Sequence, residues 1–395
     1  MTQRLTISSL GTGLLMAAIL SSCGGNSNSD NGPAAIGDTI AVNPAPDSAG
    51  FKDTIDGKAT HLYKLGNGAA TAYVTDFGAR LVALFVPDKN GTPTDVVAGF
   101  DSVKGYESAR DAYFGATIGR YGNRIAKGKF HLDGKEYSIP INNGINALHG
   151  GVKGFSDYVW DGTKTSDSTL ELTFTSKDGD EGFPGTLQAK VTYTLTANTG
   201  LKLEYLATTD KKTVLNLTNH AYYNLNGAGN GTILDHQLQI YGNGYTPIDS
   251  GLIPTGKVEP VTGTPFDFQQ PTAIGARINT DNLQLKNGKG YDINFALNAP
   301  MGADSLRHAA TVWADKSGIV MDVYTREPGL QFYTGNFMAG KHPMKYGKKD
   351  DYRTAFCLET QHFPDAPNEP SFASTVLEPG TVYHTVSEYL FSVKK

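Results

Sequence analysis

The feature that most constrains the fold is a period-two alternation of apolar and polar residues, in short segments separated by turn sequences. This pattern is typical of strands with one buried face and one solvent face. It recurs from residue 51 onward, for example in residues 71–77, 169–175, 187–195 and 201–207. No stretch sustains helical periodicity beyond about two turns. The sequence therefore predicts an all-β fold, a large antiparallel β-sandwich that buries a core between two sheets.

Turn residues separate these segments where hairpins need them. Asp133-Gly134 lies between two alternating runs, and residues 197–200, Ala-Asn-Thr-Gly, join two others. The composition agrees, because 46 Gly, 20 Tyr and 18 Phe among 395 residues favour strands and turns over helices. We expect a single sandwich domain over residues 51–395.

The N-terminal residues predict export. Arg4 precedes a short apolar stretch over residues 10–20, which is too short for a membrane span. The stretch ends at Leu20-Ser21-Ser22-Cys23-Gly24, which resembles the lipobox of bacterial lipoproteins, whose cysteine is lipid-modified and becomes the new N-terminus. We therefore expect a signal peptide over residues 1–22 and lipidation of Cys23. The alternative is a simple secretory signal cleaved nearby, with Cys23 unmodified.

A flexible tether is expected to follow the anchor. Residues 24–48 are rich in Gly, Asn, Ser, Asp, Pro and Ala, and they have too little apolar content to fold. We assign residues 23–50 to the lipidated cysteine and this tether. Cys357 is then the only free thiol, so an intrachain disulfide is excluded. The protein is expected to be exported and held at a membrane by its lipid alone, on the periplasmic or cell-surface side.

The charge balance argues against a nucleic-acid partner. The formal net charge is −5. The one basic run, residues 341–353, is interrupted by two aspartates, a proline and a glycine. We interpret this run as a solvated loop rather than a phosphate site.

Glu359 is the first candidate for chemistry. It lies in Cys-Leu-Glu-Thr-Gln-His-Phe-Pro-Asp, residues 357–365, inside a run that otherwise has the pattern of a buried strand. Burial of a carboxylate without partners is costly. Glu359 therefore either belongs to a satisfied polar network or faces a cleft where a raised pKa is useful.

Two of the nine histidines lie in dense polar and glycine-rich contexts. His149 precedes Gly150-Gly151, a pair that lets the backbone approach a ligand closely, and His220 is expected on the same strand face as Tyr222.

Three further polar residues interrupt apolar segments. Asn123 and Arg124 suit the recognition of hydroxyl groups, although an arginine that braces a loop is equally compatible. Asp292 is a second candidate carboxylate.

Motif spacing argues against several other kinds of site. The sequence has no His-Glu-x-x-His, no cysteine pair and no acidic calcium loop, so we expect no metal site. It also has no phosphate-binding P-loop, no dinucleotide fingerprint and no Gly-x-Ser-x-Gly, which disfavours a serine hydrolase.

The order of the segments resembles one family, the aldose 1-epimerases, also called galactose mutarotases. The resemblance runs from about residue 51 to residue 393. It is carried by GRYGNRIAKGKF (119–130), INNGINALHGG (141–151), NLTNHAYYNL (216–225), YTPIDSGLIPTG (245–256), YDINF (291–295), LQFYTGNF (330–337) and FCLETQ (356–361).

The resemblance implies a galactose mutarotase-like β-sandwich that binds a free hexose and interconverts its α and β anomers. It implies Glu359 as general base and His220 as general acid. The sugar-binding residues that it implies are Asn123, Arg124, His149, Tyr222, Asp292 and Gln331. Ala221 and Ile293 stand where the family commonly has a hydroxyl and a polar residue, which puts the preferred hexose in doubt.

The implied chemistry needs one base and one acid. The C1 hydroxyl loses a proton while the ring oxygen gains one; the ring opens to the aldehyde, rotates about C1–C2 and recloses. No metal or organic cofactor is needed. We expect the site of His220 to favour the cation through a nearby carboxylate or hydrogen bond. The expected partner is a free aldohexose, and the chain is expected to be a monomer or a weak dimer.

Three alternatives stay open. A glycoside hydrolase would use Glu359 and Asp292 as its paired carboxylates. A sugar-binding lipoprotein would bind without catalysis. A sugar-phosphate mutarotase has residues 341–349 as its only support.

Overall fold

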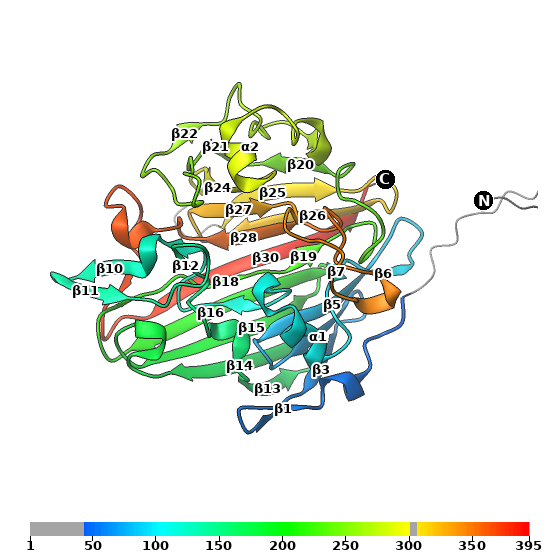
Figure 1. Ribbon diagram of the computed structural model, residues 1–395. Coiled ribbons are helices and arrows are strands. Elements are labelled where there is room, and N and C mark those ends of the chain that lie inside the picture. Colours follow the sequence, from blue (N-terminus) through cyan, green and yellow to red (C-terminus); the bar gives the residue numbers. More distant parts are fainter. Residues whose placement is uncertain (1–42, 301–305, 395) are drawn as a thin grey trace, which may run out of the picture. The chain divides into compact units, whose positions relative to one another are not determined.

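The computed structural model describes residues 43–300 and 306–394. The predicted signal peptide, Cys23 and most of the predicted tether lie outside these residues, as do residues 301–305 and 395. Within the described chain, strands dominate and helices are short (Figure 1). None of the described helices is both long and apolar enough to cross a membrane.

The largest sheet in the described residues has nine strands, all paired antiparallel. Its long strands run side by side in Figure 1. In spatial order they are β13 (Asp161–Ser166), β14 (Thr169–Ser176), β15 (Leu187–Thr196), β16 (Gly200–Thr209), β30 (Tyr383–Val393), β26 (Ile319–Thr325), β25 (Arg307–Trp313), β20 (Gln237–Ile240) and β23 (Thr272–Ala273).

The described residues also form two smaller antiparallel sheets. The five-stranded sheet has the order β22 (Glu259–Pro260), β21 (Gly242–Tyr245), β24 (Asp292–Leu297), β27 (Gly329–Tyr333) and β28 (Cys357–Gln361). The four-stranded sheet has the order β3 (Leu62–Gly66), β4 (Thr71–Thr75), β5 (Arg80–Pro87) and β6 (Pro93–Asp95).

The described residues also form short strand pairs and short helices. The pairs are β1 (Thr54–Ile55) with β2 (Lys58–Ala59), β7 (Val97–Ala98) with β19 (Tyr222–Tyr223), β8 (Thr117–Ile118) with β18 (Thr218–Asn219), β9 (Arg124–Ile125) with β12 (Ala147–Leu148), β10 (Lys129–Leu132) with β11 (Lys135–Ser138), and β17 (Thr213–Val214) with β29 (Val376–Leu377). The α-helices are α1 (Val103–Ser108) and α2 (Leu283–Gly288). The 3-10 helices are η1 (Ser48–Phe51), η2 (Arg110–Ala112), η3 (Ala126–Gly128), η4 (Phe155–Asp157), η5 (Asp180–Gly182), η6 (Ile274–Ala276), η7 (Lys345–Gly347) and η8 (Ala366–Asn368).

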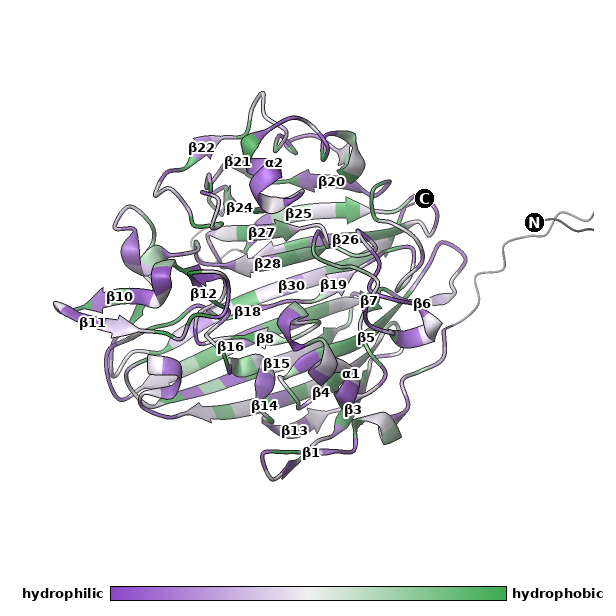
Figure 2. Ribbon diagram, viewed as in Figure 1, coloured by the Kyte–Doolittle hydropathy of each residue, from purple (hydrophilic) through white to green (hydrophobic). Residues whose placement is uncertain are grey.

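The main core lies between the nine-stranded sheet and the two smaller sheets. It joins Val191 and Leu203 of the large sheet to Phe332 of the five-stranded sheet and to Val74 of the four-stranded sheet. Apolar residues gather on these strands, whereas the β10–β11 hairpin and most loops are more hydrophilic (Figure 2). This arrangement confirms the predicted antiparallel β-sandwich.

The predicted hairpin turn at Asp133-Gly134 is also confirmed. Asp133 and Gly134 join β10 to β11, and both have a positive φ, 50° and 76°. A type I′ turn requires positive φ at both central residues, and Asp-Gly meets that requirement at low cost.

The predicted solvated loop over residues 341–353 is wrong at its centre. Lys345 is only 3% exposed, and its Nζ donates to Asp95 Oδ2 at 2.6 Å and to the carbonyl of Val97 at 2.9 Å. Asp95 lies on β6, about 250 residues before Lys345 in the chain. The charge run gave no sign of this pairing because the partner is remote in sequence.

Candidate active site

The two faces of the five-stranded sheet carry different residues. Side chains alternate between the faces of a strand. Leu358, Phe332 and Ile293 therefore enter the core, whereas their neighbours Glu359 and Gln331 face the other way and line a cleft. Glu359 and Gln331 are direct partners in the β27–β28 register.

The cleft has a volume of about 1090 Å³. It brings together all eight side chains that the sequence singled out. These are Asn123, Arg124, His149, His220, Tyr222, Asp292, Gln331 and Glu359. Asp292, Gln331 and Glu359 lie on the five-stranded sheet, and the other five lie on or directly beside short strands. Residues up to 236 positions apart in the sequence therefore line one cleft.

Two hydrogen bonds join His149 and Asn123, one between backbone groups and one to the His149 ring. The amide of His149 donates to the carbonyl of Asn123 at 3.0 Å, and the amide of Asn123 donates to His149 Nδ1 at 3.1 Å. Both residues have left-handed backbone, with φ of 51° and 64°. Such conformations are costly for residues other than glycine and often mark functional sites.

Gly150, the residue after His149, has a structural role that differs from the predicted approach to a ligand. A Cβ on Gly150 would lie 2.0 Å from the carbonyl oxygen of Gly119. Gly150 therefore permits close contact between two backbone segments of the protein, rather than close contact with a ligand.

The contact to Asn123 also settles the tautomer of His149. Because Nδ1 accepts the amide proton, Nε2 carries the proton of the neutral ring. Burial, with smaller contributions from His220 and Arg124, holds the pKa of His149 well below its ordinary value, so the ring is neutral near pH 7. His149 thus acts as a hydrogen-bond donor at Nε2.

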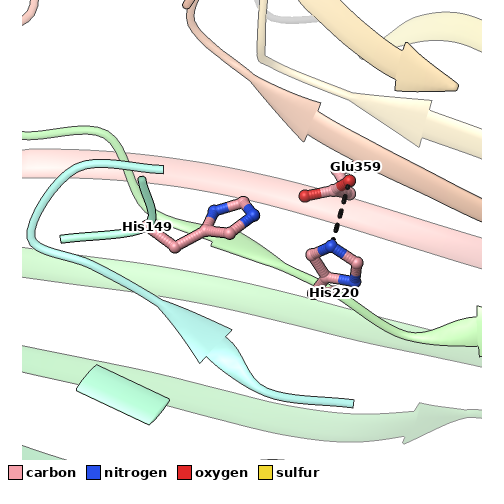
Figure 3. A group of neighbouring side chains, drawn as sticks. All are labelled: His149, His220 and Glu359. Carbon is pink, nitrogen blue, oxygen red and sulfur yellow. Dashed lines mark ion pairs between the residues drawn. The ribbon is translucent and has the colours of Figure 1, made fainter. Parts of the chain in front are cut away.

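His220 and Glu359 form a buried pair. His220 Nε2 lies 3.6 Å from Glu359 Oε1, and the two side chains point toward each other beside His149 (Figure 3). Glu359 is 2% exposed and His220 6%. Glu359 Oε2 has no hydrogen-bond partner among the described residues. The pair is therefore close but not fully satisfied.

Burial shifts both members of the pair toward their neutral forms. It raises the pKa of Glu359 well above its usual range, an effect reinforced by Asp292 and opposed by Arg124. It lowers the pKa of His220 to about 4. The expectation that the site favours the cation of His220 is therefore wrong, because desolvation is the largest effect on the ring and the positive charge of Arg80 adds to it. Between the lowered pKa of His220 and the raised pKa of Glu359, the free pair holds one proton.

A second polar group lines the cleft beside Glu359. Gln331 Nε2 donates to Asp292 Oδ1 at 2.6 Å, and Arg124 Nη2 lies 3.9 Å from Asp292 Oδ2. Arg124 Nε also donates to Asn143 Oδ1 at 3.2 Å. Gln331 Oε1 is buried without a partner in the described chain. Donors and free acceptors in one cleft suit a ligand rich in hydroxyl groups.

Tyr222 presents its ring rather than its hydroxyl group. The hydroxyl donates to the carbonyl of Ala112 at 2.9 Å, and the ring centroid lies 5.0 Å from that of His220. Tyr222 therefore packs against His220.

Tyr113 is a cleft residue that the sequence analysis missed. Its ring centroid lies 4.5 Å from that of His149 and 6.0 Å from that of His220. Its φ of 56° is left-handed. A lone tyrosine in Asp-Ala-Tyr-Phe-Gly carries no sequence signal for this position, which depends on contacts made by distant loops.

The doubt raised by Ala221 and Ile293 is not supported at these two positions. Both side chains belong to the buried core, and neither lines the cleft. They therefore do not contact a ligand bound there.

Three side chains could be considered for metal binding. His149, His220 and Glu359 each offer one ligand atom, and these atoms lie within 4.8 Å of one another. However, His149 Nε2 carries a proton while Nδ1 accepts the amide of Asn123. Coordination would require His149 to lose that hydrogen bond, so this trio does not fit a preorganised metal site.

Comparisons with known proteins agree with the geometry. Residues 61–390 match the family model described as aldose 1-epimerase. A galactose mutarotase from Bos taurus is 44% identical over 320 residues, which cover 81% of this chain and 90% of the relative. An aldose 1-epimerase from Escherichia coli K12 is 37% identical over 339 residues, covering 85% and 96%.

Solved structures show the same fold. The crystal structure of an aldose epimerase homologue from C. elegans superposes with a TM-score of 0.78 at 31% identity, covering 85% of this chain and all of that one. A galactose 1-epimerase from Lactobacillus acidophilus superposes with a TM-score of 0.76 at 26% identity, covering 87% and 97%. The chain therefore belongs to the aldose 1-epimerase family.

Proposed function

We propose that the protein interconverts the α and β anomers of free aldohexoses such as glucose and galactose, with Glu359 and His220 as the proton-transfer pair. The observation that carries this proposal is the buried pair itself. Nε2 lies 3.6 Å from Oε1, both residues line a polar cleft, and Glu359 Oε2 has no hydrogen-bond partner among the described residues. An acid and a base side by side match a reaction that adds one proton and removes another.

The reaction begins with two proton transfers. The carboxylate of Glu359 takes the proton of the C1 hydroxyl, and Nε2 of His220 gives a proton to the ring oxygen. The C1–O5 bond breaks, and C1 becomes an aldehyde. Rotation about C1–C2 presents the other face of the aldehyde, and the roles of the two residues reverse as the ring closes.

The pKa shifts make both groups reactive. The pair holds one proton, and burial makes the ionised arrangement, Glu359 carboxylate with His220 imidazolium, the less stable one. In that arrangement Glu359 is a stronger base than an ordinary carboxylate, and His220 is a stronger acid than an ordinary imidazolium. Both protons therefore move readily to and from the sugar.

The other cleft residues are assigned to binding. His149 would donate from Nε2, Asp292 would accept from sugar hydroxyls, and Arg124 would donate. Asn123 and Gln331 supply further amide groups, and the ring of Tyr222 packs beside His220.

The alternatives are less well supported. A hydrolase would need Asp292 as a second reacting carboxylate, but Gln331 and Arg124 already engage its oxygens. For a sugar phosphate, the basic run offers Lys341 at the cleft, but the central Lys345 of the run is buried against Asp95. A protein that only binds sugar would have no use for the unsatisfied acid and base.

Polarimetry tests the reaction. Freshly dissolved α-D-glucose and α-D-galactose should reach their usual final rotations faster in the presence of the protein. An assay for newly released reducing ends on an oligosaccharide should stay negative. Release of reducing sugar, or no acceleration on either hexose, would contradict the proposal.

We further propose that the protein is an exported lipoprotein anchored through Cys23, and that it is a monomer or a weak dimer. The support is the sequence Leu20-Ser21-Ser22-Cys23-Gly24 after a short apolar stretch. Metabolic labelling with a fatty acid should label the wild type and not a Cys23→Ala variant. An unlabelled wild type with a mature N-terminus elsewhere would contradict the anchor. Light scattering after gel filtration would give the oligomeric state.

A further inference from the structure

We propose that Tyr113 is a positioning residue whose ring covers His149 and His220 on their solvent side and keeps water away from the proton-transfer pair. The inference rests on the proposed function, because it concerns the surroundings in which His220 and Glu359 exchange protons with the sugar. It assigns a role to a cleft residue that belongs neither to the reacting pair nor to the predicted binding residues.

The ring of Tyr113 packs against both histidines of the cleft. Its centroid lies 4.5 Å from that of His149, at an interplanar angle of 66°, and 6.0 Å from that of His220, at 34°. His149 and His220 are 5% and 6% exposed. Tyr222 and Tyr333 also pack against His220, but both are buried, whereas Tyr113 is half-buried. Of these three tyrosines, Tyr113 is therefore the one that lies toward solvent.

A second, smaller cavity lies beside Tyr113. It has a volume of about 170 Å³, and its lining includes Asn142 and the charged side chains of Arg110, Asp111 and Asp157. Tyr113 lines both this cavity and the large cleft. Its ring packs against His149, while its hydroxyl oxygen accepts a hydrogen bond from Asn142 Nδ2 at 3.4 Å. We expect that loss of the ring would join the two cavities and let water reach the histidines.

Neighbouring contacts hold Tyr113 in this place. Its φ of 56° is left-handed, a costly conformation for a residue other than glycine, which persists only where the surroundings fix it. The carbonyl of Ala112, the preceding residue, accepts a hydrogen bond from the hydroxyl of Tyr222 at 2.9 Å. Tyr222 therefore both packs against His220 and tethers the segment that carries Tyr113.

Exclusion of water matters here because water would stabilise the charged forms of the pair. Burial lowers the pKa of His220 to about 4 and raises the pKa of Glu359 well above its usual range. These shifts make the imidazolium a stronger acid and the carboxylate a stronger base than their ordinary counterparts. If water entered beside His220, it would solvate the imidazolium, and the acid would become weaker.

Other groups also act on His220 and stay constant in the test. The titratable side chains around it, besides Tyr113, are Glu359, His149, Cys357, Tyr222 and Tyr333, and the positive charge of Arg80 acts on it as well. A change confined to Tyr113 leaves all of these groups in place.

The test compares Tyr113→Phe, which keeps the ring, with Tyr113→Gly and Tyr113→Asn, which remove it. Gly and Asn adopt a left-handed backbone at low cost, so neither variant adds backbone strain. The control Leu252→Gly removes another side chain that lines the cleft at a left-handed position, with a φ of 62°. Circular dichroism confirms that each variant is folded at each pH.

The first measurement is an NMR titration of the His220 ring in protein labelled with 15N-histidine, without sugar; a His220→Gln variant assigns the signals. His220 should titrate near pH 4 in the wild type, in Tyr113→Phe and in Leu252→Gly. In Tyr113→Gly and Tyr113→Asn it should titrate at least about one pH unit higher, toward the ordinary value of about 6.5.

Polarimetry gives the second measurement, the pH dependence of kcat/KM. In the two variants without the ring, the acid limb should move by the same amount as the titration, and kcat should fall about three- to tenfold. Tyr113→Phe should match the wild type in both.

The proposal is overturned if folded Tyr113→Gly and Tyr113→Asn titrate His220 near pH 4, or if Tyr113→Phe shifts the titration as far as they do. A wild-type ring that titrates near pH 6.5 would also overturn it. The titration is read without sugar, so these outcomes are separate from failure of the proposed reaction.

Discussion

Two of the buried acid–base pairs in the described chain differ in how well they are satisfied. Lys345 and Asp95 lie 2.6 Å apart, and the pair is completed by the carbonyl of Val97, by the hydroxyl of Tyr346 and by backbone amides that donate to Asp95. His220 and Glu359 lie 3.6 Å apart, and Glu359 Oε2 has no partner in the described chain.

The two pairs are therefore expected to have different roles: the first stabilises the fold, and the second can react with a substrate. A buried pair with every hydrogen bond made holds segments together, and it loses much when one partner is removed. A buried pair that leaves one oxygen without a hydrogen bond gains little stability from its charges, and the carboxyl group of this pair belongs to a residue that lines the cleft. Substitutions in the cleft wall are therefore expected to lower the free energy of unfolding less than substitutions of Lys345 or Asp95.

The largest expected effect is the loss of activity in Glu359→Gln. The amide cannot accept the C1 proton, so kcat/KM should fall by about 10²- to 10⁴-fold, or about 3 to 5 kcal/mol. Polarimetry on α-D-glucose measures it. The control Glu388→Gln makes the same change on β30 and should keep full activity. Wild-type rates in Glu359→Gln would remove Glu359 from the mechanism.

The next effect is on stability, at the satisfied pair. Lys345→Met leaves Asp95 buried without its cation and should lower the free energy of unfolding by about 3 to 5 kcal/mol. Urea denaturation followed by circular dichroism measures the loss. The rate per folded molecule should stay near wild type. Lys349→Met, an exposed lysine in the same run, should change stability by less than about 0.5 kcal/mol. A similarly small loss for Lys345→Met would contradict the claim that the satisfied Lys345–Asp95 pair stabilises the fold.

A smaller effect is expected for sugar binding. Asp292→Asn removes the charge beside Gln331 and Arg124, so KM should rise about tenfold while kcat falls less. Asp111→Asn changes an exposed carboxylate on the same cleft and should leave KM nearly unchanged. If kcat alone fell in Asp292→Asn, Asp292 would belong with the reacting groups instead.

The smallest effect is a gain in stability for Glu359→Gln that depends on pH. The folded pKa of Glu359 is raised, so its contribution to stability is present at low pH and is lost as pH rises through that folded value. The advantage of Glu359→Gln over wild type should therefore be larger at pH 8 than at pH 4. Urea midpoints at both pH values measure it, and an advantage that shrinks as pH rises would contradict the raised pKa.

Much of the fold could be predicted because its determinants are local. The alternation over residues 187–195 and 201–207 predicted β15 and β16, and Asp133-Gly134 predicted a hairpin turn. Glu359 was conspicuous for the same reason, since a carboxylate interrupts an apolar strand.

What could not be predicted depends on contacts between distant segments. The burial of Lys345 is decided by Asp95 on β6, and the pKa of His220 is decided by desolvation in the folded cleft. Tyr113 joins the site through its packing against His149 and His220. Single-sequence patterns carry no information on such contacts.

The pH dependence of kcat/KM tests the central claim, a shared proton on Glu359 and His220, most directly. Spontaneous mutarotation is subtracted, and circular dichroism confirms the folded fraction at each pH. The rate should fall on the acid side with a midpoint near pH 4, where His220 gains a proton and no base is left. It should fall again on the alkaline side, where Glu359 loses the last proton of the pair. An acid limb centred near 6.5, the ordinary pKa of histidine, would contradict this account.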